Sequence, residues 1–137
     1  MLPDGPKSDV SGGLERPAKK YRWLIWLAYV AAWSGALLAP IPQHLGVRIH
    51  DVDLRFVLAK TLHVSAYAVL AVLSGWLRVP SRFRWMLALF LAGHATATEF
   101  LQQYLPPRIG AVNDIGLDLI GIALGCALSW KWWCEPE

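Results

Sequence analysis

Charged residues are scarce in this sequence. Asp, Glu, Lys and Arg make up 17% of its 137 residues, whereas hydrophobic residues make up 55%. Soluble globular domains average about 25% charged residues, so this composition excludes an ordinary small water-soluble domain. A lipid bilayer is the expected surrounding of most of the chain.

The sequence contains only two cysteines, Cys126 and Cys134, which fall in one predicted helix. At a rise of about 1.5 Å per residue they lie about 12 Å apart, beyond the reach of a disulfide bond. Neither a metal-binding Cys/His spacing nor a nucleotide-binding loop or nucleophile motif accompanies them. We therefore expect no disulfide framework, no metal, no cofactor and no nucleic-acid partner, and attribute the basic charge to contact with anionic lipid headgroups.

Long apolar runs are what the sequence has in abundance. A membrane-spanning helix needs about 20 mostly apolar residues, and four runs qualify, at about 23–39, 56–77, 85–105 and 111–133. They predict an all-α integral membrane protein, a four-helix bundle over residues 21–134. Residues 1–20 are rich in Pro, Gly and Ser and are predicted to form a disordered tail. A signal peptide is an alternative for the first run, but Leu37 and Pro40 do not fit a cut after Ala39.

The positive charges predict the orientation of the bundle, because Lys and Arg near span ends are retained in the cytoplasm. With the N-terminus inside, only Arg48, Arg55, Lys60 and Arg108 face out, and nine face in: Lys7, Arg16, Lys19, Lys20, Arg22, Arg78, Arg82, Arg84 and Lys131. Both termini are therefore predicted to be cytoplasmic. Tryptophans near the cytoplasmic ends are interpreted as interfacial anchors: Trp23, Trp26, Trp76, Trp85, Trp130, Trp132 and Trp133.

Polar side chains recur on one face of each of the last three predicted helices. Ionisable groups at the centre of a span cost about 2.5 to 3.5 kcal/mol each, so they indicate function. They follow helical spacing: Lys60, His63 and Tyr67 in 56–77; Glu99 and Gln102 in 85–105; Asp114 and Asp118, continued by the GxxxG step Gly121 and Gly125, in 111–133. We expect these faces to meet near the outer surface, with Lys60 and Arg108 pairing with the acids.

Individual members of this set also have simpler interpretations. Glu99 is the hardest to explain in such a way, because an acid inside a span must be paired, protonated or facing water. For the others the alternatives are surface contact for Lys60 and Arg108, helix capping for Asp114 and Asp118, and hydrogen bonding in the core for His63, Tyr67 and His94.

The motifs KTLHVSAY and EFLQQYLPPRIGAVNDIGLDLIGIALG resemble those of the VanZ-like family of small bacterial membrane proteins, named for a teicoplanin-resistance protein. The resemblance covers about residues 55–130. Two positions depart from it: Ala59 stands where the family usually has Asp, and Asp118 where it usually has Asn, as if one acid had moved across a shared pocket. The matching positions are Lys60, His63, Tyr67, Glu99, Gln102, Arg108, Asp114, Gly121 and Gly125.

The resemblance implies a multi-pass protein of the bacterial cytoplasmic membrane with a role in envelope maintenance or antibiotic resistance. Three functions fit the residues. An outer-leaflet pocket could bind the polar head of an amphiphilic envelope ligand, such as a lipid, a lipid-linked precursor or a lipoglycopeptide. Its predicted ligand-binding residues are Lys60, His63, Tyr67, Glu99, Gln102, Arg108, Asp114 and Asp118. It could instead belong to a membrane-embedded hydrolase or headgroup transferase, with Glu99 as general acid or base and His63 as its proton partner. Lastly, the chain could be a structural or accessory subunit, within a homo-oligomer or beside another membrane protein.

Overall fold

The computed structural model describes residues 15–39, 52–104 and 112–134, and within these ranges all regular structure is helical. The helices are α1 (Glu15–Leu38), α2 (Val52–Trp76), α3 (Ser81–Gln102), α4 (Val112–Leu128) and α5 (Trp130–Cys134). The predicted all-α class is confirmed for these residues. Helix α1 begins earlier than expected, so residues 15–20, assigned from the sequence to the tail, are helical. Residues 1–14 lie outside the described ranges.

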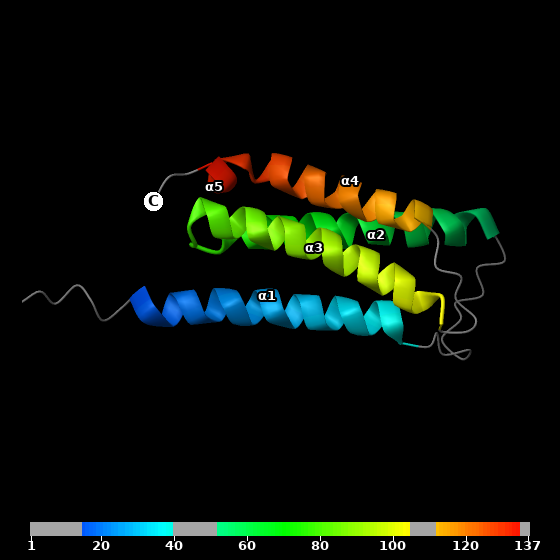
Figure 1. The fold of residues 1–137 in the computed structure, drawn as a ribbon, viewed down its shortest axis with the longest axis horizontal. Helices are drawn as coiled ribbons and strands as arrows, with labels where there is room; N and C mark the ends of the chain where they lie inside the picture. The colour runs from blue at the N-terminus through cyan, green and yellow to red at the C-terminus, as the bar shows by residue number, and fades with distance from the viewer. Residues whose placement is uncertain (1–14, 40–51, 105–111, 135–137) are drawn as a thin grey trace, which may run out of the picture.

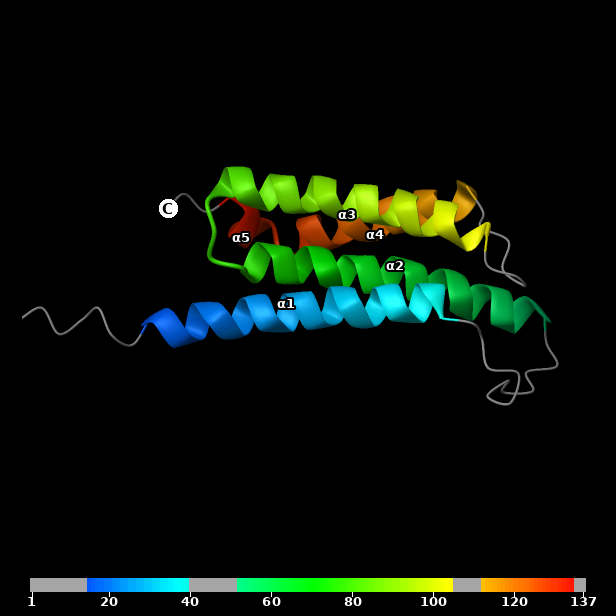
Figure 2. The ribbon, with the colours of Figure 1, turned by 60° about the horizontal axis from the view of Figure 1, so that its bottom comes forward.

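The four long helices run alternately up and down along one axis (Figure 1). Helix α2 is central: it contacts α1, α3, α4 and α5, and its interface with α4 is the most extensive. Helix α1 packs against α2 and α3 (Figure 2). We call the end that holds the start of α1, the α2–α3 turn and α5 the Pro80 end, and the end that holds the starts of α2 and α4 the Asp114 end.

The turn between α2 and α3 is short because of Pro80. A proline removes a backbone donor and disfavours helical geometry in the residue before it, and α2 accordingly ends at Trp76. Pro80 directly precedes α3, with φ of −49° and ψ of 145°. The turn therefore reverses the chain within a few residues and keeps its basic side chains at one end of the bundle.

The last predicted span is interrupted at Ser129, where the sequence predicts a continuous helix to residue 133. The Ser129 hydroxyl donates to the Gly125 carbonyl at 2.6 Å and accepts from Trp133 Nε1 at 3.0 Å. Hydrogen bonding of this kind to the preceding turn often bends a helix. The bend directs the fully buried Trp133 toward Gly75, and the indole Nε1 lies only 2.7 Å from the position that a Cβ at Gly75 would occupy.

Two glycines let α4 approach the backbone of α2. A Cβ at Gly121 would overlap with the carbonyl oxygen of Val64, and a Cβ at Gly125 would overlap with that of Ala68. Because both obstacles are backbone atoms, no side-chain rotation could make room for a larger residue. The GxxxG step predicted for close helix packing is therefore confirmed, and its partner is α2.

Among the described residues, large apolar side chains are exposed on the surface, and polar side chains are buried together with an apolar core. Large apolar side chains are exposed on the helices, for example Leu62 on α2, Leu89 on α3 and Leu128 on α4. Buried polar side chains among the described residues include Ser74, Arg84, Thr98, Glu99, Gln102, Asp118 and Ser129. Within the described ranges one stretch, Val57–Trp76, is long and apolar enough to cross a membrane. The four-span arrangement and its orientation thus stay predictions.

Two of the tryptophans interpreted as anchors belong to the core instead. Trp26 is 4% exposed and its Nε1 donates to Ser74 Oγ at 2.9 Å, while Trp133 is fully buried. Both indole nitrogens are satisfied inside the bundle, which removes their reason to reach the headgroups. Trp85, Trp130 and Trp132 are exposed, as the anchor interpretation requires.

Candidate functional site

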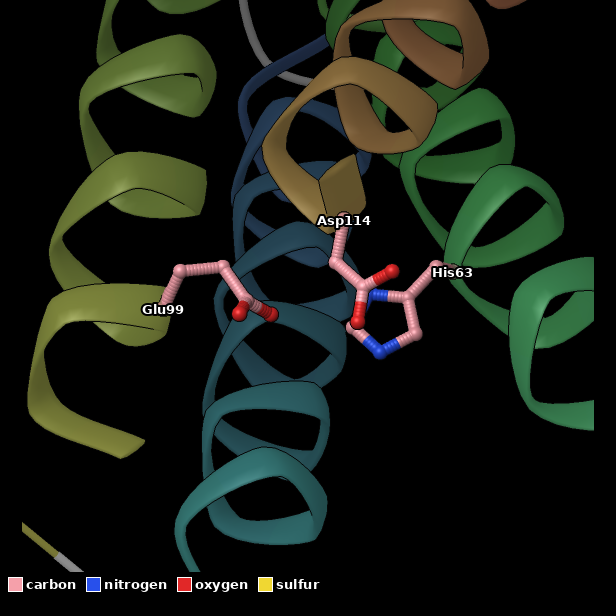
Figure 3. A group of neighbouring side chains, drawn as sticks. All are labelled: His63, Glu99 and Asp114. Carbon is pink, nitrogen blue, oxygen red and sulfur yellow. The ribbon is translucent and has the colours of Figure 1, made fainter. Parts of the chain in front are cut away.

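Three side chains from three helices converge at the Asp114 end. His63 on α2, Glu99 on α3 and Asp114 on α4 each place one nitrogen or oxygen atom within 4.8 Å of the other two. Figure 3 shows the two carboxylates and the imidazole turned toward a common space. Glu99 is 2% exposed, whereas His63 and Asp114 are only partly buried. The polar faces that the sequence predicts do meet at these residues, which we call the acid–histidine cluster.

Lys60 pairs with Asp114 and so joins α2 to α4 beside the cluster. The Lys60 ammonium donates to Asp114 Oδ1, and the two side chains are 23% and 16% exposed. Of the expected pairs between a cation and an acid, this one is present. The simpler interpretations of Lys60 as a surface-seeking residue and of Asp114 as a helix cap are therefore insufficient, although Asp114 does lie in the first turn of α4.

His63 is held by Asp118, not by Glu99 as the enzyme hypothesis assumed. His63 Nδ1 lies 2.9 Å from Asp118 Oδ1, and Asp118 is fully buried. A carboxylate only accepts, so Nδ1 carries the proton and Nε2 is the remaining nitrogen for a ligand. Within the described ranges Asp118 Oδ2 has no hydrogen-bond partner. Asp118 therefore orients His63 and is not itself accessible to a ligand from the surface.

Tyr67, predicted to bind a ligand, is instead part of a hydrogen-bonded chain in the middle of the bundle. Its hydroxyl lies 2.9 Å from His94 Nδ1, and His94 Nε2 lies 2.8 Å from Ser34 Oγ. Ser34 donates its proton to the carbonyl of Val30 at 2.7 Å. His94 Nε2–H must then donate to Ser34, and Tyr67 must donate to Nδ1, so a neutral His94 satisfies every group. The simpler interpretation of His94, hydrogen bonding in the core, is confirmed, and its partners lie on α1 and α2.

Gln102 bonds to α1 and not to a member of the cluster. Its Nε2 donates to the carbonyl of Leu37 at 3.1 Å, which ties the end of α3 to the end of α1. Arg108, predicted to bind ligand or pair with the acids, lies outside the described residues. Ala59 is exposed, whereas Asp118 is fully buried, so the two positions that depart from the family pattern have different surroundings. The idea of one acid moved across a shared pocket gains no support from this.

Sequence reasoning assigned no residue of α1 to the site, yet α1 covers it. The Trp33 ring meets the His63 ring edge-on at 5.8 Å and the Tyr67 ring at 6.4 Å. Trp26, Trp33 and Leu37 follow helical spacing, so their positions mark the face of α1 that faces the bundle. This spacing is the signal that could have identified the contribution of α1.

The acid–histidine cluster has a donor set that suits a divalent metal ion. Imidazole nitrogens and carboxylate oxygens are both zinc ligands, and metal-bound histidines usually donate their other N–H to a carboxylate, as His63 does to Asp118. However, the Lys60 ammonium occupies Asp114 Oδ1. A cation at Asp114 would compete with it, so the geometry permits a metal that the sequence motifs do not predict.

Comparison of the chain with protein-family models, with curated proteins and with solved structures gives no match. The resemblance to the VanZ-like family therefore rests on the motif residues alone and stays a prediction.

Proposed function

We propose that this chain is a multi-pass protein of the bacterial cytoplasmic membrane, of the VanZ-like type, whose acid–histidine cluster binds the polar head of an amphiphilic envelope ligand. The observation that carries the proposal is the convergence of His63, Glu99 and Asp114 from three helices within 4.8 Å. Charged groups gathered at such cost inside a bundle indicate binding or chemistry more than packing, since polar contacts between spans contribute only about 0.6 kcal/mol on average.

The membrane location is supported by the surface of the bundle. Exposed apolar side chains and buried polar ones suit a hydrocarbon solvent, in which unsatisfied polar groups are costly. Basic residues lie at the Pro80 end: Arg78 is in the α2–α3 turn, Arg82 is in the first turn of α3, and Arg22 donates to the carbonyl of Trp76 at the end of α2. Because positive charge is retained in the cytoplasm, we assign the Pro80 end to the inside and the acid–histidine cluster to the outer leaflet.

The partly exposed members of the site determine which head would fit. Lys60, His63 and Asp114 have side chains that are 23%, 14% and 16% exposed, and the buried Glu99 lies behind them. Two carboxylates accept hydrogen bonds, so the ligand must supply hydroxyl or amine donors. Lys60 could leave Asp114 for a phosphate or carboxylate on the same head. Hydroxylated or amine-bearing lipids, lipid-linked precursors and lipoglycopeptides combine these groups.

A charge-conserving exchange tests the proposal. Asn113 is exposed next to Asp114, and neighbouring positions on a helix point about 100° apart. The double variant Asn113→Asp/Asp114→Asn keeps the net charge but moves the carboxylate out of the cluster. We expect lipids that co-purify with the wild-type chain in native nanodiscs, identified by mass spectrometry, to be lost from Asp114→Asn and from the double variant. Asn113→Asp alone should retain them.

Identical lipid profiles for all four proteins would contradict binding and would favour the role of a structural or accessory subunit. Thermal unfolding of each variant shows whether a lost lipid reflects a lost fold. The prediction is specific to position, because the double variant and the wild type carry the same formal charge.

One observation favours an enzyme as the second candidate. The Asp118 carboxylate holds His63 Nδ1 at 2.9 Å, an arrangement that fixes the tautomer and leaves Nε2 as a general base. Purified chain incubated with envelope lipids, with and without zinc, should then show turnover that His63→Gln abolishes and Asp118→Asn reduces. Absence of turnover across the envelope lipid classes would exclude this candidate.

A further inference from the structure

A second, unrelated cavity lies at the Pro80 end, opposite the acid–histidine cluster. Its volume is about 310 Å³ and its wall contains three arginines, Arg22 from α1, Arg78 from the α2–α3 turn and Arg84 from α3. Gly75, Trp76 and Trp132 complete the lining. Guanidinium groups from three separate elements thus border one space, and we call it the arginine cavity.

The guanidinium groups of Arg22 and Arg84 are held in position by backbone carbonyls. Arg22 Nη1 donates to the Trp76 carbonyl at 2.8 Å, and its Cζ lies 4.5 Å from the centroid of the Trp76 ring. Arg84 is 6% exposed and its Nη1 donates to the Trp132 carbonyl. A carbonyl orients the Arg22 guanidinium without cancelling its charge, so this bond preorganises a positive group at the cavity. Phosphate is the anion that such forked donors bind best.

An apolar groove adjoins the arginine cavity. It has a volume of about 570 Å³ between α1 and α3 and is lined by Trp23, Trp26, Val79, Pro80, Phe83, Met86, Leu87 and Phe90. Two pairs of consecutive residues line both spaces. Arg22 and Arg78 line the arginine cavity, and the residues that follow them, Trp23 and Val79, line the groove. Since consecutive Cα atoms are about 3.8 Å apart, the two spaces are neighbours. From Phe83 to Phe90 the groove follows α3 for about 10 Å.

We propose that the arginine cavity and the apolar groove together bind one anionic phospholipid of the cytoplasmic leaflet. The phosphate lies among the arginines and the upper part of one acyl chain lies in the groove, whose length is about a third of a hydrocarbon core. The positive charge of the arginines favours an anionic headgroup. The apolar lining of the adjoining groove favours a lipid over free phosphate. The inference rests on the membrane location proposed above but not on the ligand of the acid–histidine cluster.

Two nearby arginines, Arg78 in the α2–α3 turn and Arg82 in the first turn of α3, provide a matched test of headgroup binding. Arg78 lines the cavity, whereas Arg82 is exposed, does not line it and lies with its Cζ 5.3 Å from the Phe83 ring centroid. Full-length chain in a neutral detergent is titrated with phosphatidylglycerol and binding is read by native mass spectrometry. Arg78→Gln should weaken binding at least about tenfold, as expected for a lost hydrogen bond to a charged group.

Arg82→Gln should weaken binding by no more than about fivefold, the effect of one nearby basic residue on a negative headgroup. Equal losses from the two variants would overturn the proposal, because they would show attraction to the charged end alone. Both residues are exposed, so neither substitution removes a core contact.

The groove has its own pair of variants. Met86 lines the groove and is 60% exposed, whereas Leu89 is 74% exposed on the same helix and does not line it. Met86→Trp should obstruct the acyl chain and weaken binding of phosphatidylglycerol, and Leu89→Trp should leave it unchanged. Unchanged binding by Met86→Trp would overturn the assignment of the acyl chain to this groove.

Two further arms separate the possible sources of the signal. Phosphatidylcholine with the same chains should bind more weakly than phosphatidylglycerol, and inorganic phosphate at millimolar concentration should fail to displace the lipid. Displacement by phosphate would overturn the lipid in favour of a free anion. The acid–histidine cluster is tested by the lipids lost from Asp114→Asn in native nanodiscs, and the arginine cavity by the difference between Arg78→Gln and Arg82→Gln, so failure at the two sites gives different results.

Discussion

Exchange of one glycine of α4 tests the close packing on which the acid–histidine cluster depends. In Gly121→Ala the added methyl group meets the carbonyl oxygen of Val64, a backbone atom that cannot rotate away. Helices α2 and α4 must then separate, and overpacking of this kind typically costs about 1 to 3 kcal/mol. Gly116 offers a matched control on the same helix, because a Cβ there has no neighbour within 4 Å.

Both substitutions gain the same intrinsic helix propensity, about 0.8 to 1.0 kcal/mol for Gly to Ala. The difference in unfolding free energy between the two variants therefore isolates the overpacking cost, and we expect Gly121→Ala to be less stable than Gly116→Ala by about 1 to 3 kcal/mol. The assay is reversible unfolding in mixed micelles with increasing dodecyl sulfate, followed by circular dichroism. Equal stability of the two variants would refute the close approach of α4 to α2.

Two further predictions concern buried polar groups. Asp118→Asn should leave the unfolding free energy unchanged or raised, because the amide oxygen still accepts from His63 Nδ1 and a buried charge is removed. Asp118→Leu should lower the unfolding free energy by about 1 to 3 kcal/mol. Equal losses from the two variants in the same micelle assay would contradict the role of the Asp118 oxygen as an acceptor. Tyr67→Phe should also cost about 1 to 3 kcal/mol, because His94 Nδ1 loses its donor. Its co-purified lipids should match those of the wild type, and a changed lipid profile in a stable Tyr67→Phe protein would return the hydroxyl to the binding site.

Much of the helical arrangement could be predicted because it depends on local patterns. Apolar runs and Pro80 mark where the long helices lie, and the spacing of Gly121 and Gly125 marks the close contact. The interruption at Ser129 was not predictable from these patterns, since it depends on a hydroxyl that Trp133 reaches only after the chain has bent.

The sequence predicts which helix faces carry the polar side chains of the site, but not which of these side chains are hydrogen-bonded to each other. Helical spacing places Lys60, His63 and Tyr67 on one side of α2, yet it does not fix how far each neighbouring helix is rotated or displaced along its axis. Those two quantities decide that His63 meets Asp118 and that Tyr67 meets His94. They also turn Gln102 toward α1, which no motif within α3 could indicate.

The hydrogen bonds of α1 are spread along its length, at Arg22, Trp26, Ser34 and the carbonyl of Leu37. Apolar contacts alone would hold α1 in many axial positions, because the hydrophobic effect is non-directional. A slip of one turn, about 5.4 Å, would break all of these bonds together. Helix α1 thus has a single favoured register against α2 and α3, and that register is what keeps the Trp33 ring over His63.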